Sequence, residues 1–189
     1  MTNAHQIFIQ NTIALWVIAV IYWVITSRTG PADHKGKELF SFIKLIGSSL
    51  IIYAPLLTNG LIATPLFITS PISDIISLIF SITGISTMIL ARHYLGKNWS
   101  GNVILQKEHT ITKIGPYKFV RHPIYSGGLL AMLGSAIVVG QIFGFAWVVF
   151  STIGLIRKIK LEEGLLSSQF PEEYPYYKKK TKMLVPFLW

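Results

Sequence analysis

Three side chains capable of binding a polar ligand, Arg121, His122 and Tyr125, gather at the start of a long apolar stretch. Residues 123–156 contain no charged side chain, and the chain then returns to basic residues and the acidic pair Glu162–Glu163. If the apolar stretch folds as a helical hairpin, the two polar groups reach the same side of a bilayer and face each other. A carboxylate there is suited to accept hydrogen bonds from a ribose diol or an ammonium group. The spacing therefore predicts a ligand-binding site.

Purely structural roles explain parts of the same pattern. Arg121 could end a basic interfacial belt, and His122 could cap a helix that begins at Pro123, since proline is favoured in the first turn. Free backbone N–H groups at that helix start would favour a carboxylate or phosphate ligand. Lys158 and Glu162, at i and i+4, could simply pair on one helix face. Serine-protease, metal-ligand and phosphate-loop patterns are absent from the sequence.

The composition places these residues in a membrane protein. Hydrophobic residues make up 51% of the 189 positions and charged residues only 13%, against roughly 25% charged in soluble domains. Runs of about 18 or more apolar residues are candidate membrane spans. The net charge of +9 lies beside such runs, which indicates contact with anionic lipid rather than nucleic acid. Because the chain has no cysteine, disulfides, thiolate metal sites and a thiol nucleophile are excluded.

We expect an all-α integral membrane protein, a single domain over residues 1–189 with about five spans. The first three spans lie within residues 1–91, and residues 92–189 form the half that carries the chemistry. Only 34 residues separate His122 from Arg157, fewer than the roughly 40 that two full spans need, so a tight hairpin turning at Gly140 is expected. The expected spans are residues 7–26, 39–58, 72–91, 123–139 and 141–156.

Small residues follow one face of the fourth expected span and should let another helix approach closely; these are Gly127, Gly128, Ala131 and Gly134. Lys44 and Asp74 stand near the ends of expected spans, and we expect both to reach toward the interface. Residues 92–121 are too polar for lipid and too long for a turn, so they should form a cytoplasmic loop that packs on the last helices.

The ordered set of motifs in the C-terminal half resembles the isoprenylcysteine carboxyl methyltransferase family and related small membrane methyltransferases, including phospholipid methyltransferases. The resemblance runs from about Asn98 to the C-terminus. Its elements are Leu95-Gly96-Lys97-Asn98-Trp99-Ser100-Gly101, His109-Thr110-Ile111-Thr112, Gly115-Pro116-Tyr117, Arg121-His122-Pro123-Ile124-Tyr125, Glu162-Glu163 and Phe170-Pro171-Glu172-Glu173-Tyr174.

This resemblance implies S-adenosylmethionine as cofactor, with S-adenosylhomocysteine as product, in a pocket between the loop and the ends of the last two spans. Lys158 stands where the family has a substrate-binding arginine, with Arg157 beside it, and both are candidate catalytic residues. A family glutamine matches either Gln106 or Ile104. The implied cofactor-contacting residues are His109, Thr110, Ile111, Thr112, Tyr117, Arg121, His122, Pro123, Ile124, Tyr125 and Glu162; no metal is implied.

The leading hypothesis is a membrane-embedded methyltransferase acting on a lipidic or amphipathic acceptor, with a carboxylate as one option. The alternatives are a phospholipid or amine N-methyltransferase, and a non-catalytic membrane ligand-binding or transport protein. A sterol-reductase-like enzyme is a further possibility, although five spans are few for it. The short chain suggests a prokaryotic inner membrane. The sequence identifies neither the acceptor nor the oligomeric state.

Lysine and arginine bias predicts the orientation, because basic loops stay cytoplasmic. Residues 58–71 contain no charge, whereas residues 92–121 and the C-terminal tail are basic. We therefore expect the N-terminus outside and the C-terminus in the cytoplasm. Reporter fusions after Lys107 and Lys179 should both give cytoplasmic signals, and opposite signals would exclude the five-span arrangement.

Overall fold

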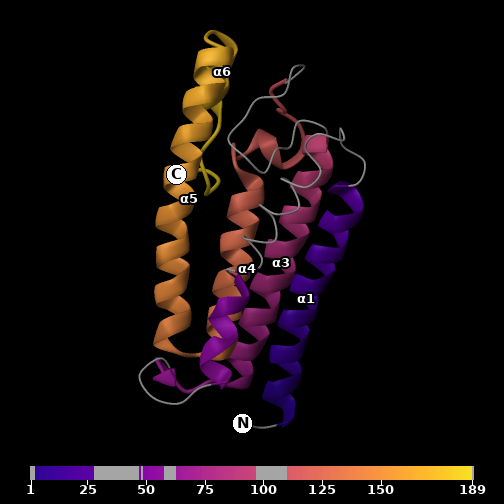
Figure 1. The fold of residues 1–189 in the computed structure, drawn as a ribbon, viewed down its shortest axis with the longest axis vertical. Coiled ribbons are helices and arrows are strands. Elements are labelled where there is room, and N and C mark those ends of the chain that lie inside the picture. Colours follow the sequence, from indigo (N-terminus) through magenta and orange to yellow (C-terminus); the bar gives the residue numbers. More distant parts are fainter. Residues whose placement is uncertain (1–2, 28–46, 48, 58–62, 97–109, 189) are drawn as a thin grey trace.

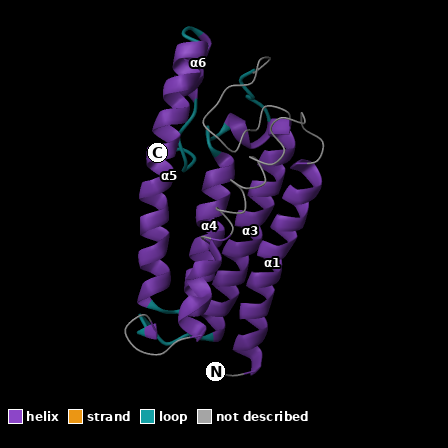
Figure 2. Ribbon diagram, in the orientation of Figure 1, coloured by secondary structure: helices purple, strands orange, loops and turns teal. Residues whose placement is uncertain are grey.

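A computed structural model of the chain describes residues 3–27, 47, 49–57, 63–96 and 110–188. The described residues form α1 (Asn3–Ser27), η1 (Ile51–Leu57), α3 (Pro71–Leu95), η4 (Gly115–Lys118), α4 (Pro123–Val139), α5 (Ile142–Gln169) and α6 (Glu173–Lys180). Figure 1 shows α1, α3, α4 and α5 running side by side, with α6 at the same end of the molecule as the C-terminal end of α5. The predominance of helix in the described part (Figure 2) confirms the predicted all-α class.

Three of these helices are long and apolar enough to cross a membrane: α1, α3 and α5. The chain is thus an integral membrane protein. α4 is apolar but has only 17 residues, about 25 Å of helix. α5 has 28 residues, so it continues past the predicted end of the last span and carries Glu162 and Glu163. Half of the second expected span, residues 39–58, lies outside the described residues, and its described end forms η1.

Local sequence signals set the helix ends. α3 begins at Pro71 after Ser70, whose side chain accepts the backbone N–H of Ser73, while the Ser73 hydroxyl in turn accepts the N–H of Ser70. This reciprocal capping satisfies two N–H groups that the helix itself leaves open. α4 begins at Pro123 and stops at Gly140, whose φ of 69° is a left-handed conformation that glycine adopts without strain.

α3 and α4 make the most extensive contact among the described elements. A Cβ added at Gly84 would lie 2.5 Å from the carbonyl oxygen of Gly127, and one added at Gly127 would lie 2.5 Å from the carbonyl oxygen of Gly84. The backbones therefore touch directly, as small residues permit in membrane helices. The predicted close approach of another helix to this face of α4 is confirmed, and α3 is that helix.

Four buried polar side chains inside the bundle form one hydrogen-bonded group. Ser135 of α4 accepts hydrogen bonds from Trp16 Nε1 at 3.0 Å and from the Tyr53 hydroxyl at 2.9 Å, and Tyr53 also lies 2.9 Å from the Thr12 hydroxyl. All four side chains are buried. Such pairing avoids the cost of an unsatisfied polar group in an apolar interior, and it joins α1, η1 and α4.

Asp74 does not reach toward the interface as expected. Its side chain is buried in the first turn of α3, and its Oδ1 lies 2.8 Å from Nδ1 of His5 in α1. The expectation was wrong because a partner 69 residues away satisfies the carboxylate inside the bundle. Lys44 lies outside the described residues.

Gly127→Ala should lower the free energy of unfolding by about 1–3 kcal/mol, the usual cost of overpacking. The added methyl group would meet backbone atoms of α3, which cannot rotate away. Gly128→Ala is the matched control, since its Cβ would meet only the Met88 sulfur at 3.7 Å. Unfolding in mixed micelles measures both variants, and equal stability of the two would contradict the direct backbone contact.

Candidate active site

The first turn of α4 and the C-terminal half of α5 meet through Glu162. The Tyr125 hydroxyl donates to Glu162 Oε1 at 2.6 Å, and His122 Nδ1 lies 3.6 Å from Glu162 Oε2. The rings of His122 and Tyr125 stack at 5.7 Å with an interplanar angle of 11°. Glu162 retains 18% side-chain exposure while His122 retains 8%. A partly open carboxylate therefore stands beside an aromatic pair, on segments separated by 37 residues.

Glu163 has a different environment from its neighbour. Arg121 Nε and Lys178 Nζ each donate to its carboxylate at 2.7 Å, and His122 Nε2 lies 3.4 Å away. The side chains of Arg121 and Glu163 are both only 8% exposed. Charge-assisted hydrogen bonds of this kind hold the carboxylate ionised and compensate for its burial. Glu163 is thus a junction between α4, α5 and α6.

The same junction engages the guanidinium group of Arg121. Its Nη1 donates to the backbone carbonyls of Lys178, at 3.2 Å, and of Thr181. Arg121 was predicted to contact a cofactor, but its head group is directed at Glu163 and at the end of α6. The sequence did not indicate a role for Lys178, because nothing in the sequence distinguishes it from the other lysines of the basic tail.

The C-terminal segment after α6 returns along the start of α4. The backbone N–H groups of Arg121 and His122 donate to the carbonyls of Lys182 and Met183 at 2.8 and 3.2 Å, and the Ser126 hydroxyl donates to the carbonyl of Leu184 at 2.6 Å. The N–H group of His122, the residue before α4, is therefore taken by the chain itself. Because the C-terminal carbonyls lie about 60 residues from these N–H groups along the chain, no sequence pattern predicts the hydrogen bonds between them.

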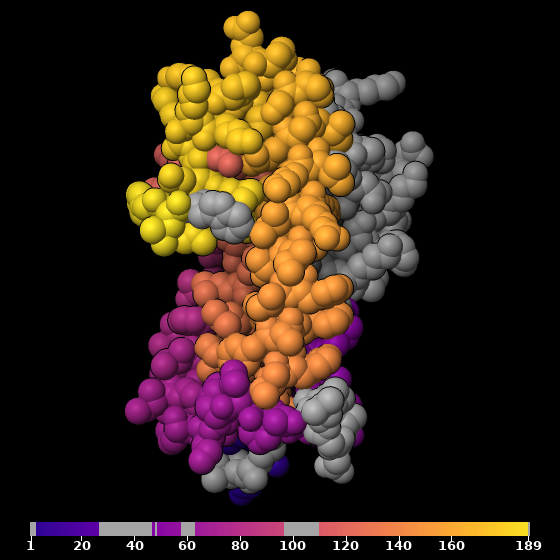
Figure 3. All heavy atoms as spheres, turned by 90° about the vertical axis from the view of Figure 1, so that its left-hand side faces the viewer, coloured from indigo at the N-terminus to yellow at the C-terminus, as the bar shows by residue number. Residues whose placement is uncertain are grey.

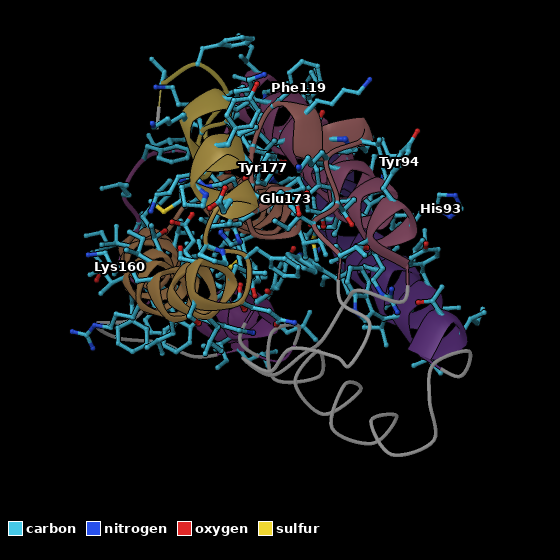
Figure 4. All side chains as sticks on the ribbon, turned by 90° about the horizontal axis from the view of Figure 1, so that it is seen from above. His93, Tyr94, Phe119, Lys160, Glu173 and Tyr177 are labelled. Carbon is cyan, nitrogen blue, oxygen red and sulfur yellow. The ribbon has the colours of Figure 1, made fainter. Side chains whose placement is uncertain are left out.

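η4 positions Tyr117 beneath α6. The Tyr177 hydroxyl donates to the carbonyl oxygen of Tyr117 at 2.7 Å, and burial raises the pKa of Tyr177 to about 12, so this donor stays protonated. Burial raises the pKa of Tyr117 as well. At the surface, Lys113 Nζ donates to Glu173 at 2.5 Å. Figure 4 shows Tyr177 and Glu173 on α6 near the centre of the view.

The two candidate catalytic cations differ in position. Lys158 Nζ lies 3.9 Å from Glu162 Oε1 and 5.4 Å from the centre of the Tyr125 ring. Arg157 is exposed, as the helical rotation of about 100° per residue requires once Lys158 faces α4. The structure therefore brings Lys158 to the cluster and leaves Arg157 at the surface.

The remaining predicted cofactor residues lie in three places. Pro123 and Ile124 are buried, and Ile124 packs into the hydrophobic core. Thr110, Ile111 and Thr112 precede η4 as chain without regular secondary structure. His109, Gln106 and Ile104 lie outside the described residues.

Known proteins resemble the part of the chain that carries this cluster. Residues 76–168 match the sequence model of the isoprenylcysteine carboxyl methyltransferase family. The chain is 41% identical over 71 residues to methanethiol S-methyltransferase 1 of Bradyrhizobium diazoefficiens, covering 38% of this chain and 24% of that protein. It is 30% identical over 129 residues to the protein-S-isoprenylcysteine O-methyltransferase of Saccharomyces cerevisiae, covering 64% of this chain and 52% of that protein.

A third relative is the methanethiol S-methyltransferase of Crocosphaera subtropica, 35% identical over 86 residues that cover 44% of this chain and 33% of that protein. The chain thus spans between about a quarter and about half of the length of these relatives. The family match begins inside α3 and runs through α4 and nearly all of α5, so it includes every residue of the Glu162 cluster. The similarity to the isoprenylcysteine carboxyl methyltransferase family therefore covers residues 76–168, just under half of the chain.

Proposed function

We propose that the protein is a membrane methyltransferase that uses S-adenosylmethionine to methylate a lipidic or amphipathic acceptor. The observation that carries the proposal is the convergence of His122, Tyr125 and Glu162, with the Tyr125 hydroxyl 2.6 Å from the carboxylate. These residues lie within the stretch that matches the family. The S-methyltransferase and O-methyltransferase relatives are both named as methyltransferases, which supports the activity.

The side chains of the cluster fit the proposed cofactor chemically. Glu162 accepts one hydroxyl at 2.6 Å, has His122 Nδ1 at 3.6 Å and Lys158 at 3.9 Å, and keeps 18% exposure. It can therefore accept hydrogen bonds from a ribose diol or an ammonium group. The aromatic pair of His122 and Tyr125 offers π faces suited to a cation. S-adenosylmethionine, when bound, supplies an electrophilic methyl group on a sulfonium.

The role of this chain is then mainly orientation and exclusion of water. Transfer of a methyl group requires in-line alignment of donor and acceptor, which is a proximity effect. An anionic acceptor is already nucleophilic and requires no general base. A neutral acceptor would require one, and the candidates are His122 and Glu163. Glu163 is held ionised by Arg121 and Lys178, and its protonation would break that pairing.

Lys158 favours an anionic acceptor. Its ammonium group lies beside the cluster with 31% side-chain exposure, so it can approach a carboxylate or thiolate held near Tyr125. The relatives' names describe an isoprenylcysteine O-methyltransferase and a methanethiol S-methyltransferase, and both acceptor groups can ionise. A cation at this position disfavours a protonated amine, so the phospholipid or amine N-methyltransferase alternative receives less support.

We also propose how the protein lies in its membrane. Residues 39–58 and α4 cross in addition to α1, α3 and α5, and α4 and α5 form the hairpin about Gly140. The N-terminus faces outward and the C-terminus the cytoplasm, in a prokaryotic inner membrane. Two observations support this. Basic residues gather in the segments placed in the cytoplasm, and the Glu162 cluster lies beside the first turn of α4, where α5 becomes charged.

His122→Ala and Glu162→Ala should each weaken binding of S-adenosylhomocysteine at least tenfold, about 1.4 kcal/mol, with the fold retained. Isothermal titration in detergent measures the affinity, and transfer of label from S-adenosylmethionine to a membrane lipid extract measures activity. Glu172→Ala, which removes an exposed carboxylate outside the cluster, is the control. Unchanged S-adenosylhomocysteine affinity in both variants would show that His122 only caps the helix and that Glu162 only forms an ion pair.

Lys158→Ala should lower methyl transfer roughly 10- to 100-fold, because a charge-assisted hydrogen bond contributes about 1.5–3 kcal/mol. Cofactor affinity should change little, and Lys158→Arg should retain activity, since arginine keeps the charge and adds a bidentate fork. Arg157→Ala is the matched control, one residue away and exposed.

Turnover and S-adenosylhomocysteine affinity are compared for all three variants. A parallel loss of cofactor affinity in Lys158→Ala would show that Lys158 acts only through Glu162. Full turnover in that variant would remove Lys158 from the mechanism.

A further inference from the structure

The last residues of the described chain carry exposed apolar side chains. Val185, Phe187 and Leu188 are 44%, 84% and 79% exposed. A turn closes at this point, with the Leu188 N–H group donating to the carbonyl of Val185 at 3.2 Å and Phe187 at a φ of 67°. The turn projects the phenyl ring outward. Three large apolar side chains, those of Val185, Phe187 and Leu188, are therefore exposed together at the end of the described chain.

The contacts of Leu184 determine where the apolar tip, residues 185–188, lies along the helix axis of α4. Leu184 is buried, and its carbonyl accepts the hydroxyl of Ser126 in the first turn of α4. That turn opens a stretch with no charge before Arg157. Residues 185–188 follow directly, so the tip lies level with the beginning of an apolar helix rather than out with α6. Figure 1 agrees, placing the C-terminus beside α5 and below α6.

The exposed side of α5 at the same level carries two leucines beside the basic residues Arg157 and Lys160. Leu161 and Leu165 are 64% and 37% exposed, and they flank Glu162 and Glu163, which contact the start of α4. Figure 3 shows the C-terminal segment lying against this part of α5. The apolar tip thus lies at the level of exposed apolar and basic side chains of α5, a mixture typical of a membrane interface.

Exposed lysines stand just before the tip. Lys179, Lys180 and Lys182 are exposed, and no acidic residue follows Glu173 in the sequence. Lys178 is not counted with them because it pairs with Glu163. A basic group followed by aromatic and aliphatic side chains matches the two layers of a membrane surface, anionic headgroups above and acyl chains below.

We propose that Lys179–Leu188 is a membrane-docking segment that binds an anionic lipid surface, with its lysines at the headgroups and Val185, Phe187 and Leu188 in the acyl boundary. The carbonyls of Lys182, Met183 and Leu184 hold the start of α4, so docking also secures the segment that covers Arg121 and His122. This proposal does not depend on the methyltransferase activity.

The absence of cysteine allows a direct test with one introduced thiol. Leu188→Cys, labelled with a nitrobenzoxadiazole fluorophore, is reconstituted in phosphatidylcholine vesicles with and without an equal part of phosphatidylglycerol. Glu172→Cys is the matched control, because it is exposed at the turn between α5 and α6, away from the tip. Nitroxide on the lipid acyl chain and aqueous iodide serve as quenchers.

The Leu188 label should be quenched by the lipid nitroxide and protected from iodide, and the Glu172 label should show the reverse. Replacing Lys179, Lys180 and Lys182 with glutamine should remove the added quenching that phosphatidylglycerol produces. The expected loss is about fivefold per lysine in the partition constant, the equivalent of about 1 kcal/mol each.

Three results would overturn the proposal. Iodide access at Leu188 equal to that at Glu172 would place the tip in water. Protection from both quenchers would place it against protein, and dependence of that protection on protein density in the vesicle would identify a second copy. Lipid quenching that is independent of both phosphatidylglycerol and the lysines would eliminate the anionic surface as the partner.

Discussion

The ionised carboxylate of Glu163 is the group on which the arrangement of the site depends. An isolated charge in a buried position costs several kcal/mol, and here Arg121 and Lys178 offset it at 2.7 Å each. The two cations come from the start of α4 and from α6, while Glu163 belongs to α5. Removing either would leave a buried charge with fewer donors, so the three elements are held in place together.

Adjacent glutamates in this helix carry different tasks. A rotation of about 100° per residue directs Glu163 into the junction and Glu162 toward Tyr125. Glu163 is 8% exposed and surrounded by cations, whereas Glu162 is 18% exposed and accepts one hydroxyl. The first is suited to hold structure and the second to bind a ligand. Separating these roles allows a ligand to occupy Glu162 without disturbing the pairing that positions it.

α4 presents the site and is held at three points. Its start is covered by the carbonyls of Lys182 and Met183, its middle touches the backbone of α3 at Gly84 and Gly127, and its end stops at Gly140. Backbone contact leaves little freedom for sliding, because no flexible side chain stands between the helices. A short helix, whose position is set by rigid contacts, can hold His122 and Tyr125 in fixed relation to Glu162.

The sequence alone determined what depends on local signals. Charge-free runs indicated membrane helices, Pro123 and Gly140 marked the ends of α4, and helical spacing placed Lys158 beside Glu162. The meeting of Tyr125 with Glu162 was also predictable, because one apolar stretch joins them. His109 and half of the second expected span fall outside the described residues.

Tertiary structure decided which charged groups became partners. Asp74 pairs with His5 across 69 residues, and the C-terminal carbonyls take the backbone donors of Arg121 and His122. Nothing in a basic tail distinguishes Lys178 from Lys179 until α6 folds back on α4. The physical reason is that buried charges select partners by distance in three dimensions, whereas helix ends and apolar spans are set by neighbours along the chain.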